Sequence, residues 1–239
     1  MEPQLRQLLE AAARPYREAG RYAWNFARGK LRRDPVFLAL LRDGLLPESG
    51  DLVDLGCGQG LLLSLLRAAK EQSAAGRWPQ GWPAPPARLA LRGIEWHPAR
   101  VQAARGALGS AARVDLRDLS ELRDADLRPC SVIVLLDVLL YLDEAAQERV
   151  IGLAAAALGP GGLLLMREAD AAAGLAFQLT KWSARLDAAM RGRFAQPLRC
   201  RSAARWVAEL ARRGLTVETR PMSQGTLFAN ILFVARKVV

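Results

Sequence analysis

Short apolar runs alternate with helically spaced apolar positions along most of this chain. Runs of four to eight apolar or β-branched residues, bounded by Gly, Pro or Asp, predict buried strands. Strands are expected at residues 52–55, 89–95, 112–114, 131–136, 163–167, 215–219 and 227–235. Helices are expected at residues 61–70, 98–108, 143–158 and 202–213. Because strands alternate with helices, the pattern indicates an α/β fold whose mostly parallel sheet is covered on both faces.

The two ends of the chain depart from this alternation. Residues 4–43 are helical in pattern, with Asp34-Pro35 expected to begin a helix. The last two strands are joined by a loop around 221–226 without a helix, which predicts an antiparallel pair at one edge. The sequence therefore predicts a helical extension or lid at 1–48, and a doubly wound, seven-stranded domain at 49–239 with one antiparallel edge strand.

A glycine-rich turn follows the first strand. Residues 51–60 run Asp-Leu-Val-Asp-Leu-Gly-Cys-Gly-Gln-Gly, and an apolar helical run follows at 61–66. Glycines allow positive φ and close approach of a ligand, and a helix start offers unpaired N–H groups. The spacing is G-x-G-x-G, which differs from the G-x-G-x-x-G fingerprint of dinucleotide-binding folds.

This stretch resembles the first motif of class I S-adenosylmethionine-dependent methyltransferases, Asp/Glu-x-Gly-x-Gly-x-Gly. The residues that match or line it are Asp54, Gly56, Cys57, Gly58, Gln59 and Gly60. The resemblance implies the seven-stranded fold of that family, S-adenosylmethionine as cofactor, and these residues as part of its binding site. The similarity extends over about residues 50–170.

Three acids later in the chain fit the same resemblance. Glu95 ends the second strand, where the family's acid accepts hydrogen bonds from both ribose hydroxyls, and Trp96 follows it. A Pro- and Trp-rich insertion at 71–87 explains why Glu95 lies 35 residues after Gly60. The other expected cofactor contacts are Asp115 with Leu116 at the adenine, and Asp137 with Val138 at the methionine part. Asp118 is an alternative to Asp115, and Asp137 alone could instead cap a helix.

The N-terminal extension contributes a further candidate. Tyr22, Trp24 and Phe26 precede Arg28, and an arginine before the first strand meets the cofactor carboxylate in several related methyltransferases. The resemblance therefore implies Arg28 as a cofactor ligand, although a surface role and helix packing of the aromatics are the simpler alternatives.

The sequence names no catalytic base. The one histidine, His97, follows Glu95 on the expected adenosine side, where a helix-cap role is favoured. Tyr22, Tyr141 and Glu168 are weak candidates for the acceptor side. The Asn-Pro-Pro-Tyr tetrapeptide of amino-group DNA methylases does not follow the fourth strand. Methyl transfer needs alignment above all, because the cofactor is already activated.

Composition and charge limit the partners and the compartment. The three cysteines, Cys57, Cys130 and Cys200, are far apart without metal-ligand spacing, so no metal and a reducing, cytoplasmic compartment are expected. No secretory signal or membrane helix is expected, and peripheral membrane contact is left open. The net charge of +10 comes from arginines along the whole chain, which favours solvated helix faces over nucleic acid.

The residues thus predict a methyltransferase for a small apolar, phenolic, aryl or acyl acceptor. Arg28-Gly29-Lys30-Leu31, with Met222–Thr226 and Phe228-Ala229-Asn230, faintly resembles methyltransferases of bacterial aryl-polyene and fatty-acid-like clusters. That resemblance implies an acceptor held on an acidic carrier protein. An RNA methyltransferase and a non-catalytic scaffold with this fold are the alternatives.

Overall fold

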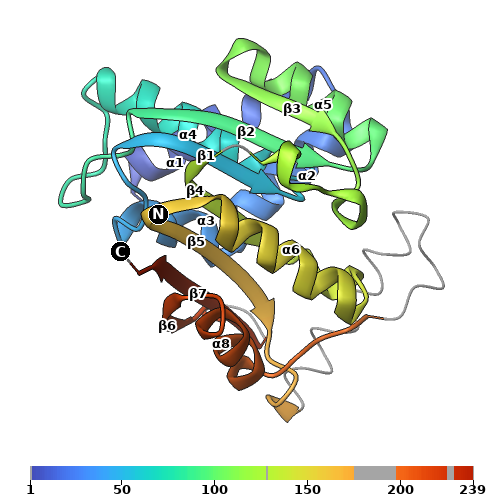
Figure 1. Cartoon of the computed structure of the whole chain (residues 1–239). Coiled ribbons are helices and arrows are strands. Elements are labelled where there is room, and N and C mark those ends of the chain that lie inside the picture. Colours follow the sequence, from blue (N-terminus) through green and yellow to red (C-terminus); the bar gives the residue numbers. More distant parts are fainter. Residues whose placement is uncertain (1, 128, 175–197, 225–228, 239) are drawn as a thin grey trace. The chain divides into compact units, whose positions relative to one another are not determined.

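The computed structural model describes residues 2–127, 129–174, 198–224 and 229–238 (Figure 1). Contacts divide the chain into two compact units, Met1–Asp118 and Leu119–Val239. Three strands belong to the first unit and four to the second, which makes the seven strands that the pattern predicts.

The first unit contains five α-helices and three strands among its described residues. In chain order they are α1 (Pro3–Ala13), η1 (Arg14–Arg17), α2 (Arg21–Arg33), α3 (Pro35–Arg42), β1 (Ser49–Leu55), α4 (Leu61–Ala74), β2 (Arg88–Glu95), α5 (Pro98–Leu108), η2 (Gly109–Ala111) and β3 (Ala112–Leu116). The strands lie in the order β3-β2-β1 and are all parallel. Their carboxyl ends therefore share one edge, where open α/β sheets bind ligands.

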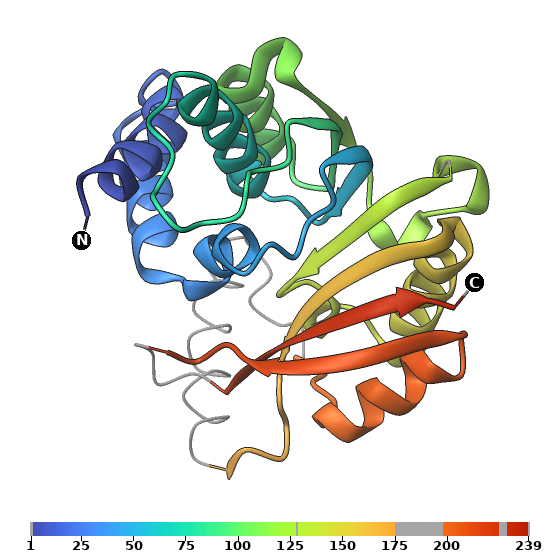
Figure 2. The same cartoon turned by 90° about the vertical axis from the view of Figure 1, so that its left-hand side faces the viewer.

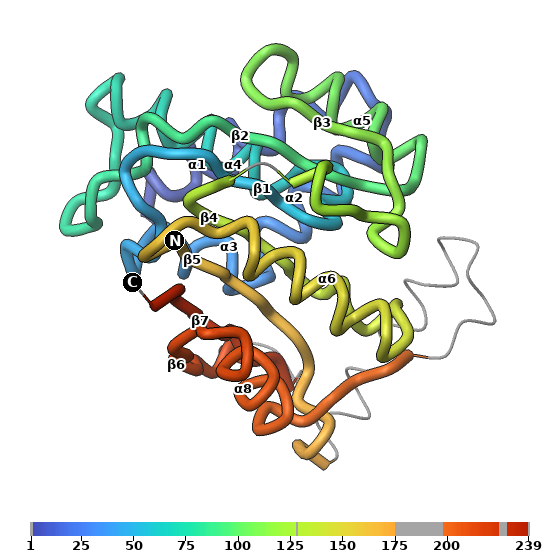
Figure 3. Tube along the Cα trace, viewed as in Figure 1, coloured from blue at the N-terminus to red at the C-terminus, as the bar shows by residue number. Residues whose placement is uncertain are grey.

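The N-terminal helices are integral to the packing of this unit. Asp34 caps α3 as predicted, because its Oδ1 accepts a hydrogen bond from the N–H of Val36 at 3.2 Å. Helix α1 lies beside α4 (Figure 3), and the hydroxyl of Ser64 donates to the carbonyl of Ala12 at 2.8 Å. Residues 1–48 belong to the same compact unit as β1–β3; their role as a separate extension or lid stays a prediction.

The second unit carries the other four strands. Its elements are η3 (Leu119–Glu121), η4 (Asp124–Asp126), β4 (Cys130–Leu136), η5 (Leu139–Tyr141), α6 (Glu144–Ala157), β5 (Leu158–Ala169), α8 (Ala203–Ala211), β6 (Leu215–Pro221) and β7 (Asn230–Lys237). Strand β5 is parallel to β4, with Leu135 opposite Met166.

The antiparallel strand of the second unit is β7. It pairs antiparallel with both β5 and β6, so the strand order is β4-β5-β7-β6. The last strand of the chain, β7, therefore lies between β5 and the edge strand β6 (Figure 2, where β5, β7 and β6 are gold, red and orange). The antiparallel pair predicted from the helix-free connection is confirmed. The order of its two members comes from long-range pairing.

Strand β5 begins earlier than the sequence predicts. Residues Gly159-Pro160-Gly161-Gly162, which lie between the predicted helix at 143–158 and the predicted strand at 163–167, belong to β5, which starts at Leu158. The pairing with β4 jumps from Cys130–Leu158 to Val132–Leu163, so these residues form an irregular segment. Gly161 has a φ of +70°, which a glycine adopts without steric cost.

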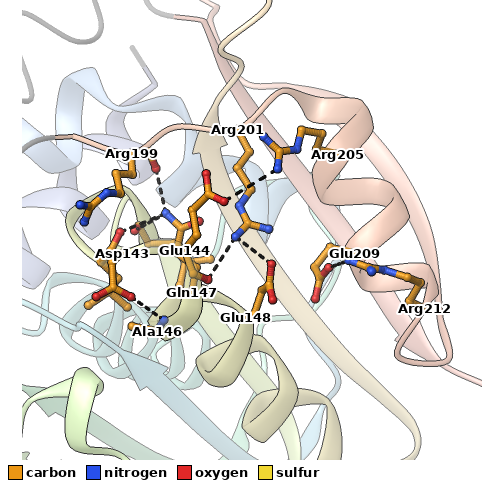
Figure 4. A network of polar contacts seen from close by, with 12 residues as sticks. Asp143, Glu144, Ala146, Gln147, Glu148, Arg199, Arg201, Arg205, Glu209 and Arg212 are labelled. Carbon is orange, nitrogen blue, oxygen red and sulfur yellow. Dashed lines mark hydrogen bonds and ion pairs between the residues drawn. The ribbon is translucent and has the colours of Figure 1, made fainter.

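Buried polar side chains connect residues 199–201, just before α8, to helix α6 by hydrogen bonds (Figure 4). The side-chain amide of the fully buried Gln147 donates to the carbonyls of Leu139 and Arg199, at 2.9 and 2.8 Å. Arg201 donates to the carbonyl of Glu144 at 3.1 Å and to the carboxylate of Glu148 at 3.2 Å. These contacts bring residues more than 50 positions apart into one packed unit.

No helix within the described residues is both long and apolar enough to cross a membrane.

Candidate cofactor site

The glycine-rich turn connects β1 to α4 through three residues with positive φ. Gly56, Gly58 and Gly60 have φ angles of +76°, +57° and +75°. A Cβ on Gly60 would lie 2.9 Å from Leu108 Cδ1 and 3.3 Å from Ala104 Cβ, so the close approach of α5 adds to the positive φ in favouring glycine there. A Cβ on Gly58 would meet only the guanidinium of Arg100, at 3.9 Å. Packing within the protein therefore restricts Gly60 more than Gly58.

Glu95 holds the turn in place from the end of β2. Its Oε2 accepts a hydrogen bond from the N–H of Gly58 at 2.9 Å, and its Oε1 accepts one from the N–H of His97 at 3.0 Å. A carboxylate oxygen can accept two hydrogen bonds, so each oxygen retains one acceptor position. The side chain predicted to bind the ribose hydroxyls is therefore preorganised by the backbone of the predicted motif.

A second buried carboxyl, Asp54, lies on β1 next to this one. Burial raises the pKa of Asp54 to about 7, and the negative charge of Glu95 adds to the increase. Asp54 is 4% exposed, so the two carboxylates repel each other across a poorly hydrated space. Asp54 can therefore keep its proton near neutral pH, which lowers this repulsion.

Cys57 and Gln59 take different parts in the turn. The Cys57 thiol points at β2, where a Cβ on Gly93 would lie only 2.6 Å from its Sγ. Burial holds the pKa of Cys57 well above its ordinary value, so the thiol packs as an apolar group. The carbonyl of Gln59 accepts a hydrogen bond from the hydroxyl of Tyr16 at 2.7 Å.

Tyr16 is a residue that the sequence analysis missed. It is fully buried in η1, 43 positions before its partner in the turn. Burial raises its pKa well above the ordinary value, so its hydroxyl stays a donor. No spacing rule connects a tyrosine after Pro15 with a turn so far along the chain, and only the packing of η1 reveals the contact.

We expect Tyr16→Phe to lower the free energy of unfolding by about 1–2 kcal/mol, because the partly buried Gln59 carbonyl loses its donor. Affinity for S-adenosylhomocysteine should fall several-fold as the turn loosens, which titration calorimetry measures. Tyr22→Phe is the matched control, since Tyr22 is 66% exposed. Equal effects of the two variants would remove Tyr16 from the support of the turn.

The strand register separates Asp115 from Glu95. Leu116 lies opposite Glu95, whereas Asp115 lies opposite Ile94 and so points to the other face. Arg92 and Arg113 donate to Asp115 at 2.7 and 2.8 Å. Burial opposes ionisation, but these hydrogen bonds outweigh it and hold the pKa of Asp115 below its ordinary value.

These contacts change what each residue offers to an adenine ring. Leu116 is 51% exposed and adjoins the predicted ribose acid, so it presents an apolar contact. Asp115 is engaged by two arginines, and its pairing with an adenine amino group stays a prediction, as does the alternative, Asp118. The apolar contact is the better supported of the two by the register.

Arg28 lies over an aromatic ring. Its guanidinium is 4.7 Å from the Trp24 ring centroid, as is that of Arg17. The Nε of Arg28 is buried and has no hydrogen-bond partner in the described part of the chain. Trp96, at the end of β2, packs edge-on against His97 at 5.2 Å. The roles of Arg28 and Trp96 at the cofactor stay predictions.

In the second unit, Asp137 and Val138 follow β4. Asp137 has a φ of +58°, and is the one non-glycine residue with positive φ among those described. Its side chain is bound by the buried Arg167, whose Nε donates to Oδ1 at 2.9 Å and whose Nη2 contacts Oδ2. The Asp137 N–H donates to the Arg167 carbonyl at 3.0 Å. Asp137 is therefore held by β5 and does not cap a helix.

Glu168, on β5, accepts a hydrogen bond from the same turn. Its Oε1 accepts a hydrogen bond from the N–H of Leu139 at 2.8 Å. Burial, and next the charge of Asp137, raise the pKa of Glu168 to about 8. The strain at Asp137 and this buried acid mark the end of β4 as a specialised turn. In the sequence, the only sign of this arrangement was the charged pair Arg167-Glu168 at the end of an apolar run. The sequence analysis did not identify Arg167 as a site residue.

Part of the C-terminal motif cannot be placed. Residues 225–228, with Gly225, Thr226 and Phe228, lie outside the described residues.

Comparisons with known proteins identify the family and the fold of this chain. A family model described as a methyltransferase domain matches residues 23–219. The curated carboxy-S-adenosyl-L-methionine synthase of Chromohalobacter salexigens is 32% identical over 134 residues, or 55% of this chain and 44% of that protein.

Solved structures share the fold. An O-methyltransferase family protein from Burkholderia thailandensis matches with a TM-score of 0.66 at 21% identity, over 91% of this chain and 59% of that one. Magnesium protoporphyrin IX methyltransferase from Synechocystis PCC 6803, solved with bound S-adenosylhomocysteine, matches with a TM-score of 0.59 at 18% identity, over 97% of each chain. The chain spans less than two thirds of the curated relative and of the Burkholderia protein. The predicted Rossmann-like fold class is confirmed.

Proposed function

We propose, because the chain belongs to the methyltransferase domain family, that it transfers the methyl group of S-adenosylmethionine to a small, largely apolar or phenolic acceptor. The expected class I family and its cofactor are confirmed by the match to that family. The observation that carries the proposal is the bond between Glu95 and the N–H of Gly58, which joins the ribose acid to the glycine turn.

The residues present fit S-adenosylmethionine. The backbone of Gly58 has only the Arg100 guanidinium near it, which leaves room for close approach, and Glu95 has one acceptor position on each oxygen for two neighbouring hydroxyls. Leu116 offers an apolar contact beside them. Asp54, Gly56 and Gly60 shape the turn, and Cys57 and Gln59 support it from within.

The bound cofactor supplies a methyl group that is already activated by its sulfonium. The chain then has to bind, orient and exclude water, and needs a base only for an acceptor that must lose a proton. Glu168 holds its proton up to about pH 8, so it is not a base at neutral pH. A phenol loses its proton more readily than an aliphatic alcohol, so a phenolic acceptor would depend less on a base.

The proposal is tested by titration calorimetry with S-adenosylhomocysteine, with NAD as the control. Binding of the homocysteine compound alone supports the cofactor, and methyl transfer to a panel of phenols, aryl acids and their carrier-bound thioesters then identifies the acceptor. If neither compound binds, the chain is a scaffold with this fold or needs a partner to complete its site.

We expect Glu95→Gln to weaken the binding of S-adenosylhomocysteine by about 1–3 kcal/mol, roughly five- to 150-fold, because a neutral amide with one acceptor oxygen replaces two charged acceptors. Titration calorimetry measures the loss. Glu71→Gln is the control, because Glu71 is an exposed acid in the same unit, paired with Arg67. Unchanged affinity of the Glu95 variant would exclude Glu95 from the site.

An RNA methyltransferase is the second candidate, and the net charge of +10 is the observation that favours it. Binding of RNA with a steep salt dependence, followed by methyl transfer to it, would replace the small acceptor by RNA. The cytoplasm stays our proposal for the compartment, since all three cysteines are free thiols.

A further inference from the structure

Although arginines occur along the whole chain, one helical segment has few acids to balance them. Residues 14–33, which include η1 and α2, contain seven arginines or lysines and a single acid, Glu18, so this segment has a net charge of +6. The whole chain has a net charge of +10. More than half of the excess charge therefore lies within 20 residues, in the first unit.

The solvent-facing side of α2 is basic. Ala23, Ala27 and Leu31 form its buried side. The opposite side, named here the α2 face, consists of Arg21, Tyr22, Asn25, Gly29, Arg32 and Arg33. Its arginines and Tyr22 are exposed. Arginine and tyrosine are the residue types that contribute most to protein interfaces.

Gly29 lies at the centre of the α2 face. Glycine inside a helix costs about 0.5–1 kcal/mol relative to alanine, so its presence there needs a reason. A Cβ on Gly29 would meet nothing within 4 Å, and its φ is not positive, so neither packing nor conformation of this chain requires a glycine. A bare helix surface does allow a second helix to approach closely, with Arg32 and Arg33 one turn along.

We propose that the α2 face is a docking surface for an acidic α-helix of a partner protein. Lys30 of this segment is already paired with Asp34 at 2.7 Å, so the charge offered by the α2 face is that of Arg21, Arg32 and Arg33. Three arginines without an acid fit a helix rich in Glu and Asp, because guanidinium groups bind carboxylates with two parallel hydrogen bonds. Helix α2 has 13 residues, about 20 Å, which is long enough for three turns of contact. This inference does not depend on methyl transfer.

Two other anionic partners fit the surface less well. A membrane would need the apolar side of α2, and that side is buried in the protein. A single-stranded nucleic acid would need open aromatic rings for stacking. Trp24 is covered by the guanidinium groups of Arg17 and Arg28, and Tyr22 stacks on Phe26 at 6.5 Å.

The test uses the full-length protein and a synthetic helical peptide of about 20 residues with glutamates spaced four apart along one side. Fluorescence anisotropy at about 50 mM salt measures its binding. The same peptide with lysines, an oligonucleotide and anionic lipid vesicles are compared. We expect the Glu peptide to bind best.

Two variants decide where it binds. The triple variant Arg21→Glu, Arg32→Glu, Arg33→Glu should weaken binding of the peptide at least tenfold. The control triple variant Arg88→Glu, Arg123→Glu, Arg236→Glu makes the same change in net charge at exposed positions and should weaken binding much less. Gly29→Leu keeps the charge and should also weaken binding about tenfold, because it blocks close approach.

Each contrary result overturns the proposal. Equal loss in both triple variants would mean unspecific attraction, and full binding by Gly29→Leu would exclude helix contact at that glycine. Tighter binding of the oligonucleotide or of the vesicles would assign the face to that partner. Thermal melting checks folding, and Gly29→Ala should raise the melting temperature slightly, since alanine is the better helix former.

Discussion

Replacing Gly58 by valine should abolish measurable binding of S-adenosylhomocysteine and leave the protein folded. The site has room for a side chain in the free protein, because a Cβ there meets nothing nearer than 3.9 Å. A ligand that approaches the backbone of the turn would collide with the valine. We expect affinity to fall by roughly 100-fold or more, about 3 kcal/mol.

Valine at Gly58 also strains the backbone, and a matched variant separates this strain from the collision with the ligand. Gly58 has a φ of +57°, where a valine costs about 1–2 kcal/mol of stability. Gly76, just after α4, has a φ of +68° and equally open surroundings. Gly76→Val should show a similar fall in melting temperature and unchanged affinity. Tight binding by Gly58→Val would overturn the assignment of the turn.

The second large effect concerns Asp54 and pH. In the unfolded chain this carboxyl ionises near pH 4, whereas in the folded protein its pKa is about 7. Between these values unfolding releases a proton, so the free energy of unfolding falls as pH rises, by up to 1.4 kcal/mol per pH unit at constant other charges. The total is about 4 kcal/mol, reached above pH 7.

Asp54→Asn removes this titration. The variant should therefore be more stable than the parent at pH 8, and its stability relative to the parent should decline as pH falls to 5. Urea unfolding at several pH values measures both curves. Glu218→Gln is the control. Glu218 is an exposed acid whose pKa is held below its ordinary value by the hydrogen bond from Arg220, so it stays ionised from pH 5 to pH 8 and adds no pH dependence to the free energy of unfolding there. Parallel curves for parent and Asp54→Asn would mean that Asp54 is already ionised in the folded protein.

The local sequence determined most of the fold and the centre of the candidate site. The helix at 98–108 has the predicted bounds, and the other predicted strands and helices that lie in the described residues are present with shifted ends. Periodicity, caps and glycine turns act over a few residues, so they can be recognised without coordinates. The same holds for Gly56, Gly58 and Gly60, whose positive φ follows from the turn that they form.

Only the tertiary structure decided which distant groups meet. The hydroxyl of Tyr16 reaches Gln59, Arg167 binds Asp137, and the register puts Leu116 rather than Asp115 beside Glu95. Strand β7 takes its place between β5 and β6 for the same reason. These choices depend on burial and hydrogen-bond pairing between segments far apart in the chain, and such pairing leaves no periodic trace in the sequence.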